Sequence, residues 1–183
     1  MGPLTTHSAD HHSSTEQAPD SSQDLQIRPP SLADGADMWR LARDSGTLDL
    51  NTSYAYLLLA RDFAASSRLV LQDGEAVGFV LGYLRPTAPG TLFIWQIAVD
   101  ASQRGKQVAG RMLDALLEDL PQVTQLETTI TEDNTASQRL FASFARRHGA
   151  EERIEPLITE QHFPDAGHGA ELLHTISPLH AGS

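Results

Sequence analysis

The chain has 183 residues, 24 of them acidic and 13 basic, with a formal net charge of −11 and no cysteine. Its length suits one domain of about 150 residues plus a tail. The missing cysteine excludes disulfides, thiolate metal sites and a thiol nucleophile, and we expect no metal centre. The acidic balance argues against general binding to nucleic acids or anionic membranes. We find no leader and no apolar run of about 18 residues, so we expect a cytoplasmic protein.

The first 24 residues are polar and almost free of large apolar side chains. They cannot offset the entropy of ordering, so we expect a disordered tail over 1–24. The folded domain is expected over 25–177, with a C-terminal tail over 178–183. The domain opens with a short strand at 25–28, which two prolines end. Apolar spacing and capping residues then predict two helices, the first capped by Ser31 or Asp34 and running to about residue 44, the second at 53–65.

A hairpin follows these helices. Its strands are expected at 68–72 and 76–84, joined by Asp73-Gly74, a dipeptide favoured in tight type I′ turns. The remaining predicted elements are a strand at 92–99, a helix beginning at Val108, a strand at 125–131, a helix at 135–148 and two strands within 150–176. This order predicts an α/β fold in which helices flank one mixed sheet.

Residues 91–113 carry the clearest chemical pattern. A buried strand leads into Arg104, Gly105 and Lys106, and Val108 then begins an amphipathic helix. The first turn of a helix has free N–H groups and a partial positive charge, so it binds anions through main-chain donors. The segment therefore indicates a pyrophosphate site, although an ordinary strand-to-helix turn fits the same residues.

Here the chain resembles the GNAT superfamily of acyl-CoA-dependent N-acyltransferases. The loop pattern of that family is Arg or Gln, two residues, Gly, one residue, Gly or Ala. It falls on Arg104, Gln107 and Ala109, so Gln107 stands where the family has its central glycine. The resemblance implies a mostly antiparallel sheet with acetyl-CoA bound between splayed central strands. It places these residues on the cofactor: Ile97, Ala98, Val99, Arg104, Gly105, Lys106, Gln107, Val108, Ala109 and Asn134.

Acyl transfer needs a neutral amine, a donor for the oxyanion of the tetrahedral intermediate and a proton for the leaving thiolate. Many family members supply that proton with a tyrosine seven residues after an asparagine on the last major helix. Asn134 matches the asparagine and can also cap the helix, but Phe141 replaces the tyrosine. Tyr54 is the acid that we expect instead, with core packing in a helix as its alternative role. Tyr56 and Tyr83 are the other tyrosines.

Longer stretches resemble the L-2,4-diaminobutyrate acetyltransferases of ectoine biosynthesis, over about residues 25–177. They are LDLNTSYAYLLL, VGFVLGYLRPTAPGTLFIWQIAVD, LETTITEDNTAS and the terminal HF followed by GAELLHTI. The resemblance implies transfer of the acetyl group of acetyl-CoA to the 4-amino group of diaminobutyrate, by a homodimer. It also places four residues around the substrate: Asp49, Tyr54, Trp95 and Glu171.

That substrate carries two ammonium groups and a carboxylate, so acidic side chains suit its site. Asp49 and Glu171 can each pair with an ammonium, and either can act as the base, directly or through water. Trp95 can offer its ring face to a cation. His162 and His168 are alternative bases, since imidazole titrates near neutrality. Asp49 also fits an ordinary turn or cap, and Trp95 also fits a core position.

Two other functions are compatible with the sequence. One is acetylation of another small amine or polyamine. The other is binding of acyl-CoA without catalysis, which the replacements at Gln107 and Phe141 leave open.

Overall fold

The structure, a computed structural model, describes residues 25–179, so the tail predicted over 1–24 lies outside the described residues. The helices are α1 (Gly35–Ser45), α2 (Ser53–Asp62), α3 (Val108–Asp119) and α4 (Thr135–Arg147). The strands are β1 (Gln26–Arg28), β2 (Arg68–Gln72), β3 (Glu75–Arg85), β4 (Ala88–Val99), β5 (Gln125–Thr131), β6 (Glu151–Ile158) and β7 (Glu171–Ser177). Their order along the chain is the order that the sequence predicts.

The described strands form one sheet in the order β1-β2-β3-β4-β5-β7-β6. β4 and β5 are parallel, and every other neighbouring pair is antiparallel. A parallel pair needs a crossover connection, which α3 supplies. The prediction of a mixed, mostly antiparallel sheet flanked by helices is therefore confirmed.

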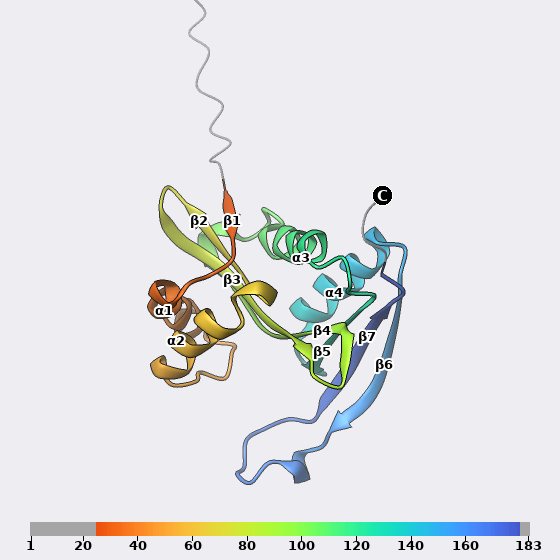
Figure 1. The fold of residues 1–183 in the computed structure, drawn as a ribbon. Coiled ribbons are helices and arrows are strands. Elements are labelled where there is room, and N and C mark those ends of the chain that lie inside the picture. Colours follow the sequence, from red (N-terminus) through yellow and green to blue (C-terminus); the bar gives the residue numbers. More distant parts are fainter. Residues whose placement is uncertain (1–24, 180–183) are drawn as a thin grey trace, which may run out of the picture.

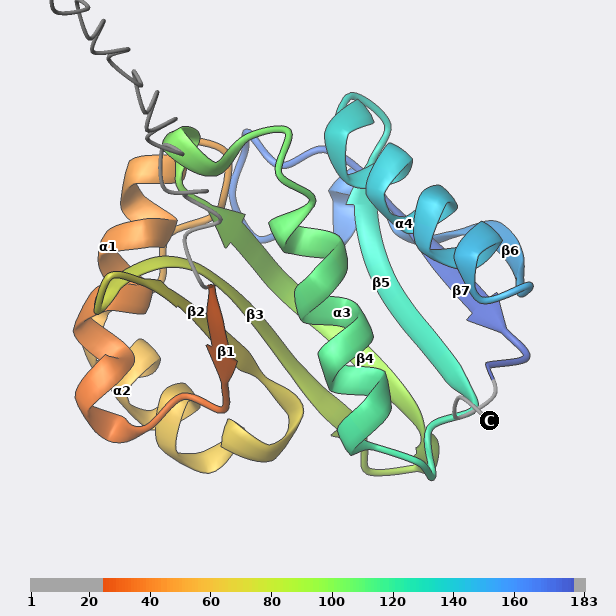
Figure 2. The same ribbon diagram turned by 90° about the horizontal axis from the view of Figure 1, so that it is seen from above.

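Helices cover the two faces of this sheet unequally. On one face α3 and α4 pack through buried side chains such as Met112 and Phe144. On the opposite face α1 and α2 pack against β3, where Met38 and Tyr56 meet Phe79. Figure 1 shows α1 and α2 beside the first strands and the β6–β7 pair extending away from them. Figure 2 shows α3 over the middle of the sheet and α4 over β5 and β7. The second face of β5 and β7 thus lies beyond the reach of α1 and α2.

The turn between β2 and β3 is the predicted one. Asp73 and Gly74 have φ angles of 52° and 84°. Positive φ at both central residues is what a type I′ turn requires. The short hairpin keeps β2 and β3 next to each other and brings β4 to the centre of the sheet.

A bulge interrupts β4 at Trp95. Two consecutive residues of β3, Leu81 and Gly82, pair with Gln96 and Ile94, so Trp95 has no partner in β3. A bulge leaves one residue outside the ladder and bends its strand. Trp95 consequently escapes the regular alternation of β4, and its side chain is 44% exposed.

β4 and β5 separate about midway along both strands. The parallel ladder joins residues 91–94 to 125–128 and stops there, although both strands continue. At the last pair the Thr128 hydroxyl donates to the main-chain oxygen of Ile94 at 3.0 Å. The predicted splay of the central strands is therefore present. Main-chain groups of the second half of β4 that face β5 have no strand partner and can bind a ligand.

The described chain stays packed slightly beyond β7. Leu179 belongs to the segment predicted as a C-terminal tail, yet it is buried and its N–H donates to the main-chain oxygen of Thr124 at 2.7 Å. No helix within 25–179 is long and apolar enough to cross a bilayer. The same part of the chain contains no cluster of three or more His, Cys, Asp or Glu side chains that could hold a metal ion.

Candidate active site

Two cavities open on opposite sides of the gap between β4 and β5. The larger one, of about 940 Å³, lies on the face of β5 and β7 that faces away from α3 and α4. We call it the open-face cavity. The smaller one, of about 350 Å³, lies beneath α3 and α4 and is called the helix-side cavity. The two share these lining residues: Thr47, Leu48, Trp95, Gln96, Thr129, Ile130 and Asn134. They therefore meet in the gap, where reactants from the two sides can touch.

The helix-side cavity contains part of the predicted cofactor site. Its lining includes Ile97, Val99, Ala109 and Asn134. Ala98 is buried in the core under α1 and α2. Asn134 also caps α4, because its side-chain oxygen accepts the N–H of Ser137 at 3.1 Å. The cap role is thus observed, and contact with the cofactor stays a prediction for all of these residues.

The loop before α3 leaves the first turn of that helix uncapped by a side chain. Its N-cap residue is Gln107, which has a left-handed φ of 57° and makes no capping bond. The N–H groups at the start of α3, beginning with Val108, are therefore available to an anion. Lys106 donates to the Gln103 side chain at 3.2 Å. The turn before α3 consists of residues 104–107. Contact between this turn and a pyrophosphate stays a prediction.

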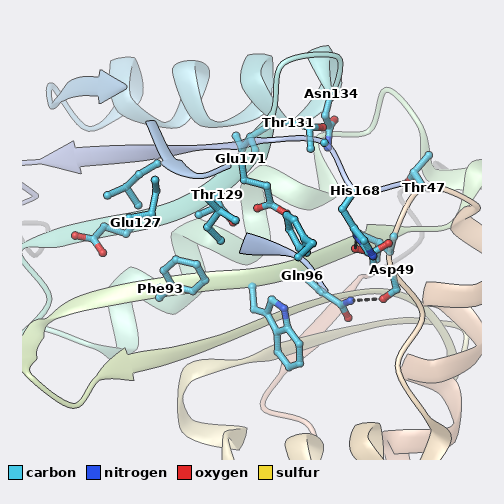
Figure 3. Close-up of a pocket in the computed structure, with 18 of the residues that line it drawn as sticks. Thr47, Asp49, Phe93, Gln96, Glu127, Thr129, Thr131, Asn134, His168 and Glu171 are labelled. Atoms are coloured by element: carbon cyan, nitrogen blue, oxygen red, sulfur yellow. Dashed lines mark hydrogen bonds and ion pairs between the residues drawn. The ribbon is translucent and has the colours of Figure 1, made fainter. Parts of the chain in front are cut away.

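Carboxylates dominate the charge of the open-face cavity. Its acidic lining residues are Asp49, Glu127, Asp133 and Glu171. Arg85 is the only lysine or arginine among the described residues that line either cavity. In Figure 3, Glu127 and Phe93 lie toward one end, Asp49 and His168 toward the other, and Glu171 and Thr129 between them. Such a surface favours a ligand with more positive than negative charge.

The structure brings three of the four predicted substrate residues to this cavity. Asp49, Trp95 and Glu171 line it, and the exposed ring of Trp95 is accessible to a ligand. Tyr54 lies in the first turn of α2, is 67% exposed and lines neither cavity. Its role as proton donor stays a prediction. Tyr83 is the tyrosine that lines the open-face cavity.

The two candidate histidines lie in different surroundings. His168 lines the open-face cavity and stacks on Phe163 with 4.5 Å between ring centroids. Its Nδ1 is 3.9 Å from the nearer carboxylate oxygen of Asp49. His162 lines neither cavity, and its Nδ1 accepts the N–H of Thr159 at 2.9 Å. Of the two, only His168 is therefore placed to exchange a proton with a ligand in the cavity.

Sequence reasoning did not find the chain of hydrogen bonds that runs from the buried Tyr56 to Asp49. The Tyr56 hydroxyl donates to Oε1 of Gln96 at 2.8 Å, and Nε2 of Gln96 donates to the main-chain oxygen of Asp49 at 2.9 Å. The second bond is drawn in Figure 3. Burial raises the pKa of the Tyr56 phenol, which keeps it a neutral donor. The available signal was a glutamine inside an apolar strand, since buried amides need partners.

A second network lies at the other end of the open-face cavity. Glu127 is buried, and both of its carboxylate oxygens accept hydrogen bonds. One bond comes from Nη1 of Arg85 at 2.9 Å and the other from Nε2 of Gln125 at 2.8 Å. The structure places Glu127 on the cavity wall.

Known proteins similar to this chain are acetyltransferases. The profile of the acetyltransferase (GNAT) family matches residues 35–145. The chain is 53% identical over 164 residues to L-2,4-diaminobutyric acid acetyltransferase of Streptomyces coelicolor, covering 87% of this chain and 96% of that protein. It is 44% identical over 152 residues to the protein of that name from Marinococcus halophilus, covering 82% and 88%.

A solved structure of the same kind superposes well. It is diaminobutyrate acetyltransferase EctA from Paenibacillus lautus, in complex with its substrate L-2,4-diaminobutyric acid and coenzyme A. The TM-score is 0.82 at 35% identity, with 85% of this chain and 96% of that chain covered. The matched profile spans α1 to α4 and includes both strands of the central gap. This chain therefore belongs to the GNAT family of acetyltransferases.

Proposed function

We propose that this protein transfers the acetyl group of acetyl-CoA to the 4-amino group of L-2,4-diaminobutyrate, giving N4-acetyl-L-2,4-diaminobutyrate for ectoine biosynthesis. The observation that carries the proposal is the meeting of two cavities in the gap between β4 and β5. Acetyl-CoA enters from the helix side and the amine from the open face. Supporting it, relatives at 53% and 44% identity carry this activity in their names, and EctA from Paenibacillus lautus binds both reactants.

The charges of the open-face cavity suit this amine. Diaminobutyrate carries two ammonium groups and one carboxylate near neutral pH. The cavity presents several carboxylates and a single guanidinium, that of Arg85. Trp95 adds an exposed ring that can contact an ammonium. An amine without a carboxylate leaves the guanidinium without a ligand, so the cavity favours an amino acid over a polyamine.

The reaction begins with loss of a proton from the 4-ammonium, because an ammonium has no lone pair for attack on the thioester. We assign this proton to Asp49, toward the His168 end of the cavity, or to Glu171, which lies nearer the middle. Main-chain N–H groups of β4 beyond Ile94, where the ladder to β5 has ended, stabilise the oxyanion. The new C–N bond forms, the C–S bond breaks, and the remaining excess proton of the nitrogen passes to the thiolate.

The first test is turnover. Purified protein with acetyl-CoA and diaminobutyrate should release coenzyme A above the rate without amine. Asp49→Ala should lose at least about 90% of that activity, a loss of roughly 1.4 kcal/mol or more in transition-state stabilisation, while acetyl-CoA binding stays intact. Asp62→Ala is the control, since Asp62 is exposed at the end of α2 and lines neither cavity. If acetyl-CoA binds but no coenzyme A is released in the presence of any amine, the protein is instead a non-catalytic binding protein.

The source of the thiolate proton is tested by a pair of variants. Tyr54→Phe and Tyr83→Phe each remove one phenol, and only Tyr83 lines the cavity. The donor is the tyrosine whose variant loses turnover across the pH range in which a phenol is protonated. A homodimer and a cytoplasmic location complete the proposal, and light scattering coupled to size-exclusion chromatography tests the first of them.

A further inference from the structure

Among the described residues, Arg85 is the one arginine or lysine in a cavity lined by carboxylates. It is the last residue of β3, and Glu127 lies on β5, so β4 runs between the two. The carboxylate is 7% exposed while the guanidinium is 41% exposed. A guanidinium has five N–H donors, and the bond to Glu127 uses one of them. The remaining donors are available to a ligand that reaches this end of the cavity.

The network around Arg85 holds its guanidinium in place. Glu127 accepts from Arg85 at 2.9 Å and from Gln125 at 2.8 Å, so the buried carboxylate is fixed from two sides. Glu127 pairs with Phe93 in the β4–β5 ladder, inside the part of the sheet where the strands are still joined. Arg85 is thereby anchored on the rigid side of the point where the strands separate.

The distance from this anchor to the gap fits one small amino acid. Glu127 and Thr129 are two residues apart on β5, about 7 Å at roughly 3.3 Å per residue, and Thr129 lines both cavities. In diaminobutyrate four bonds of about 1.5 Å separate the 4-nitrogen from the carboxyl carbon, roughly 5 Å when extended. With a hydrogen bond of about 2.8 Å from its carboxylate to the guanidinium, diaminobutyrate can reach from Arg85 to the gap between β4 and β5.

We propose that Arg85 binds the α-carboxylate of the substrate and thereby selects α-amino acids over diamines, with Glu127 and Gln125 as positioning residues. This inference rests on the proposed function, because it needs the 4-amino group in the gap between β4 and β5. The carboxylate then lies at the Arg85 end of the open-face cavity, and Asp49 and His168 lie toward the opposite end of the same cavity.

The test compares wild-type protein and an Arg85 variant on two substrates, one with the carboxylate and one without it. 1,3-Diaminopropane has the two amines of diaminobutyrate and lacks only the carboxylate. In Arg85→Met, kcat/KM for diaminobutyrate should fall roughly 30- to 100-fold, the range for losing a charge-assisted hydrogen bond pair. The kcat/KM for 1,3-diaminopropane should change less than about threefold. Arg85→Lys should recover part of the loss, since it keeps the charge without the planar fork.

Arg153→Met is the matched control, because Arg153 is 73% exposed on β6, pairs with Glu155 and lines neither cavity. It should leave both substrates unaffected. If Arg85→Met lowers both substrates equally, Arg85 has only a structural role and the proposal is overturned. Equal use of both substrates by the wild-type protein overturns it as well, while leaving acetyl transfer intact.

Folding of the variant is checked separately. Arg85→Met leaves the buried Glu127 carboxylate without its cation, which destabilises the fold. If the thermal unfolding midpoint falls below the assay temperature, the double variant Arg85→Met with Glu127→Gln removes that charge. Titration of diaminobutyrate and 1,3-diaminopropane into this variant, with coenzyme A present, should give equal affinities. A retained preference for diaminobutyrate overturns the proposal. Absence of any turnover by the wild-type protein instead contradicts the proposed function.

Discussion

Gln96 and Asp49 are joined across the edge of the open-face cavity, where the side-chain Nε2 of Gln96 donates to the main-chain oxygen of Asp49 at 2.9 Å. The two residues are 47 positions apart in the sequence. Gln96 follows the bulge of β4, and Asp49 lies in the segment between α1 and α2. The main chain at Asp49 is therefore tied to a strand of the sheet as well as to its own segment.

Gln96→Leu should separate these two elements. It removes the Gln96 partner of the Tyr56 hydroxyl and of the Asp49 carbonyl, and each lost hydrogen bond costs on the order of 1 kcal/mol. We expect a free energy of unfolding lower by about 2 kcal/mol or more. The KM for the amine should rise about tenfold as Asp49 loses its position, while the KM for acetyl-CoA changes little. Urea unfolding and steady-state kinetics with each substrate varied in turn measure both effects.

Tyr56→Phe is the control for this prediction. It removes the bond from Tyr56 to Gln96 and keeps the bond from Gln96 to Asp49. We expect a smaller loss of stability and an almost unchanged KM for the amine. Equal kinetic effects of the two variants would contradict a specific link between Gln96 and Asp49.

The bulge of β4 depends on a glycine in the neighbouring strand. A Cβ on Gly82 would lie 2.8 Å from the main-chain oxygen of Phe93 and 3.0 Å from that of Ser66. Main-chain atoms cannot move aside as a flexible side chain can, so Gly82→Ala should shift β3 against β4. We expect destabilisation of roughly 2–3 kcal/mol, as in overpacked cores.

Gly90→Ala is the matched control for Gly82→Ala. The nearest atom to a Cβ there is the Thr124 hydroxyl at 3.4 Å, an ordinary contact. Its thermal unfolding midpoint should stay close to that of the wild-type protein. A similar fall for both variants would show that any side chain in β4 or its neighbours is destabilising, whatever the bulge.

Local patterns predicted the elements because each depends on neighbours in the sequence. β2 and β5 have the predicted bounds, and the Asp73-Gly74 turn follows from the residues that tolerate positive φ. The splay of the central strands could not be read in this way. It depends on where the β4–β5 ladder stops, which no residue of either strand encodes alone. Resemblance to a family supplied that part.

The candidate site was harder to predict where distant segments meet. Tyr54 and Tyr56 lie on opposite sides of α2, since residues two apart on a helix are about 200° apart. Only one of them can face the core, and the sequence does not say which. The structure buries Tyr56 against Gln96 and leaves Tyr54 exposed. The contact of Arg85 with Glu127 spans 42 residues and was equally out of reach of local patterns.

The ion pair between Arg28 and Asp34 predicts a pH dependence of stability. Nη1 and Nη2 of Arg28 donate to the two oxygens of Asp34 at 2.8 and 2.7 Å. The hydrogen bonds from Arg28, aided by Ser31, lower the pKa of the Asp34 carboxyl from 3.8 to about 2. A folded-state pKa below the unfolded value stabilises the fold above about pH 4, and this contribution disappears as the pH falls through about 2.

The contribution amounts to about 2 kcal/mol at neutral pH. Asp34→Asn should therefore be less stable than the wild-type protein by about that amount at pH 6, with the difference shrinking below pH 4. Urea unfolding at pH 6, 4 and 3 measures it. Asp44→Asn is the control, because Asp44 pairs with Arg43 at the exposed surface, where ion pairs contribute about 0–1 kcal/mol. A constant difference between Asp34→Asn and the wild-type protein over this range would refute the assignment.

Gln107 predicts a gain in stability from a single substitution. Its φ of 57° lies in the left-handed region, which glycine adopts without the Cβ clash of other residues. Gln107→Gly should therefore raise the free energy of unfolding by about 1 kcal/mol. If the loop binds pyrophosphate through main-chain N–H groups, the affinity for acetyl-CoA is preserved or improved.

Gln107→Ala separates backbone strain from the loss of the side chain. Alanine removes the glutamine amide but keeps the Cβ, so it retains the strain and should show no gain in stability. Calorimetric titration of acetyl-CoA into Gln107→Gly and Gln107→Ala measures the affinity of each variant for the cofactor. Equal, large losses of affinity in both would mean that the Gln107 amide itself contacts the cofactor. An unchanged affinity in both, with stability raised only by glycine, assigns the role of this position to its backbone.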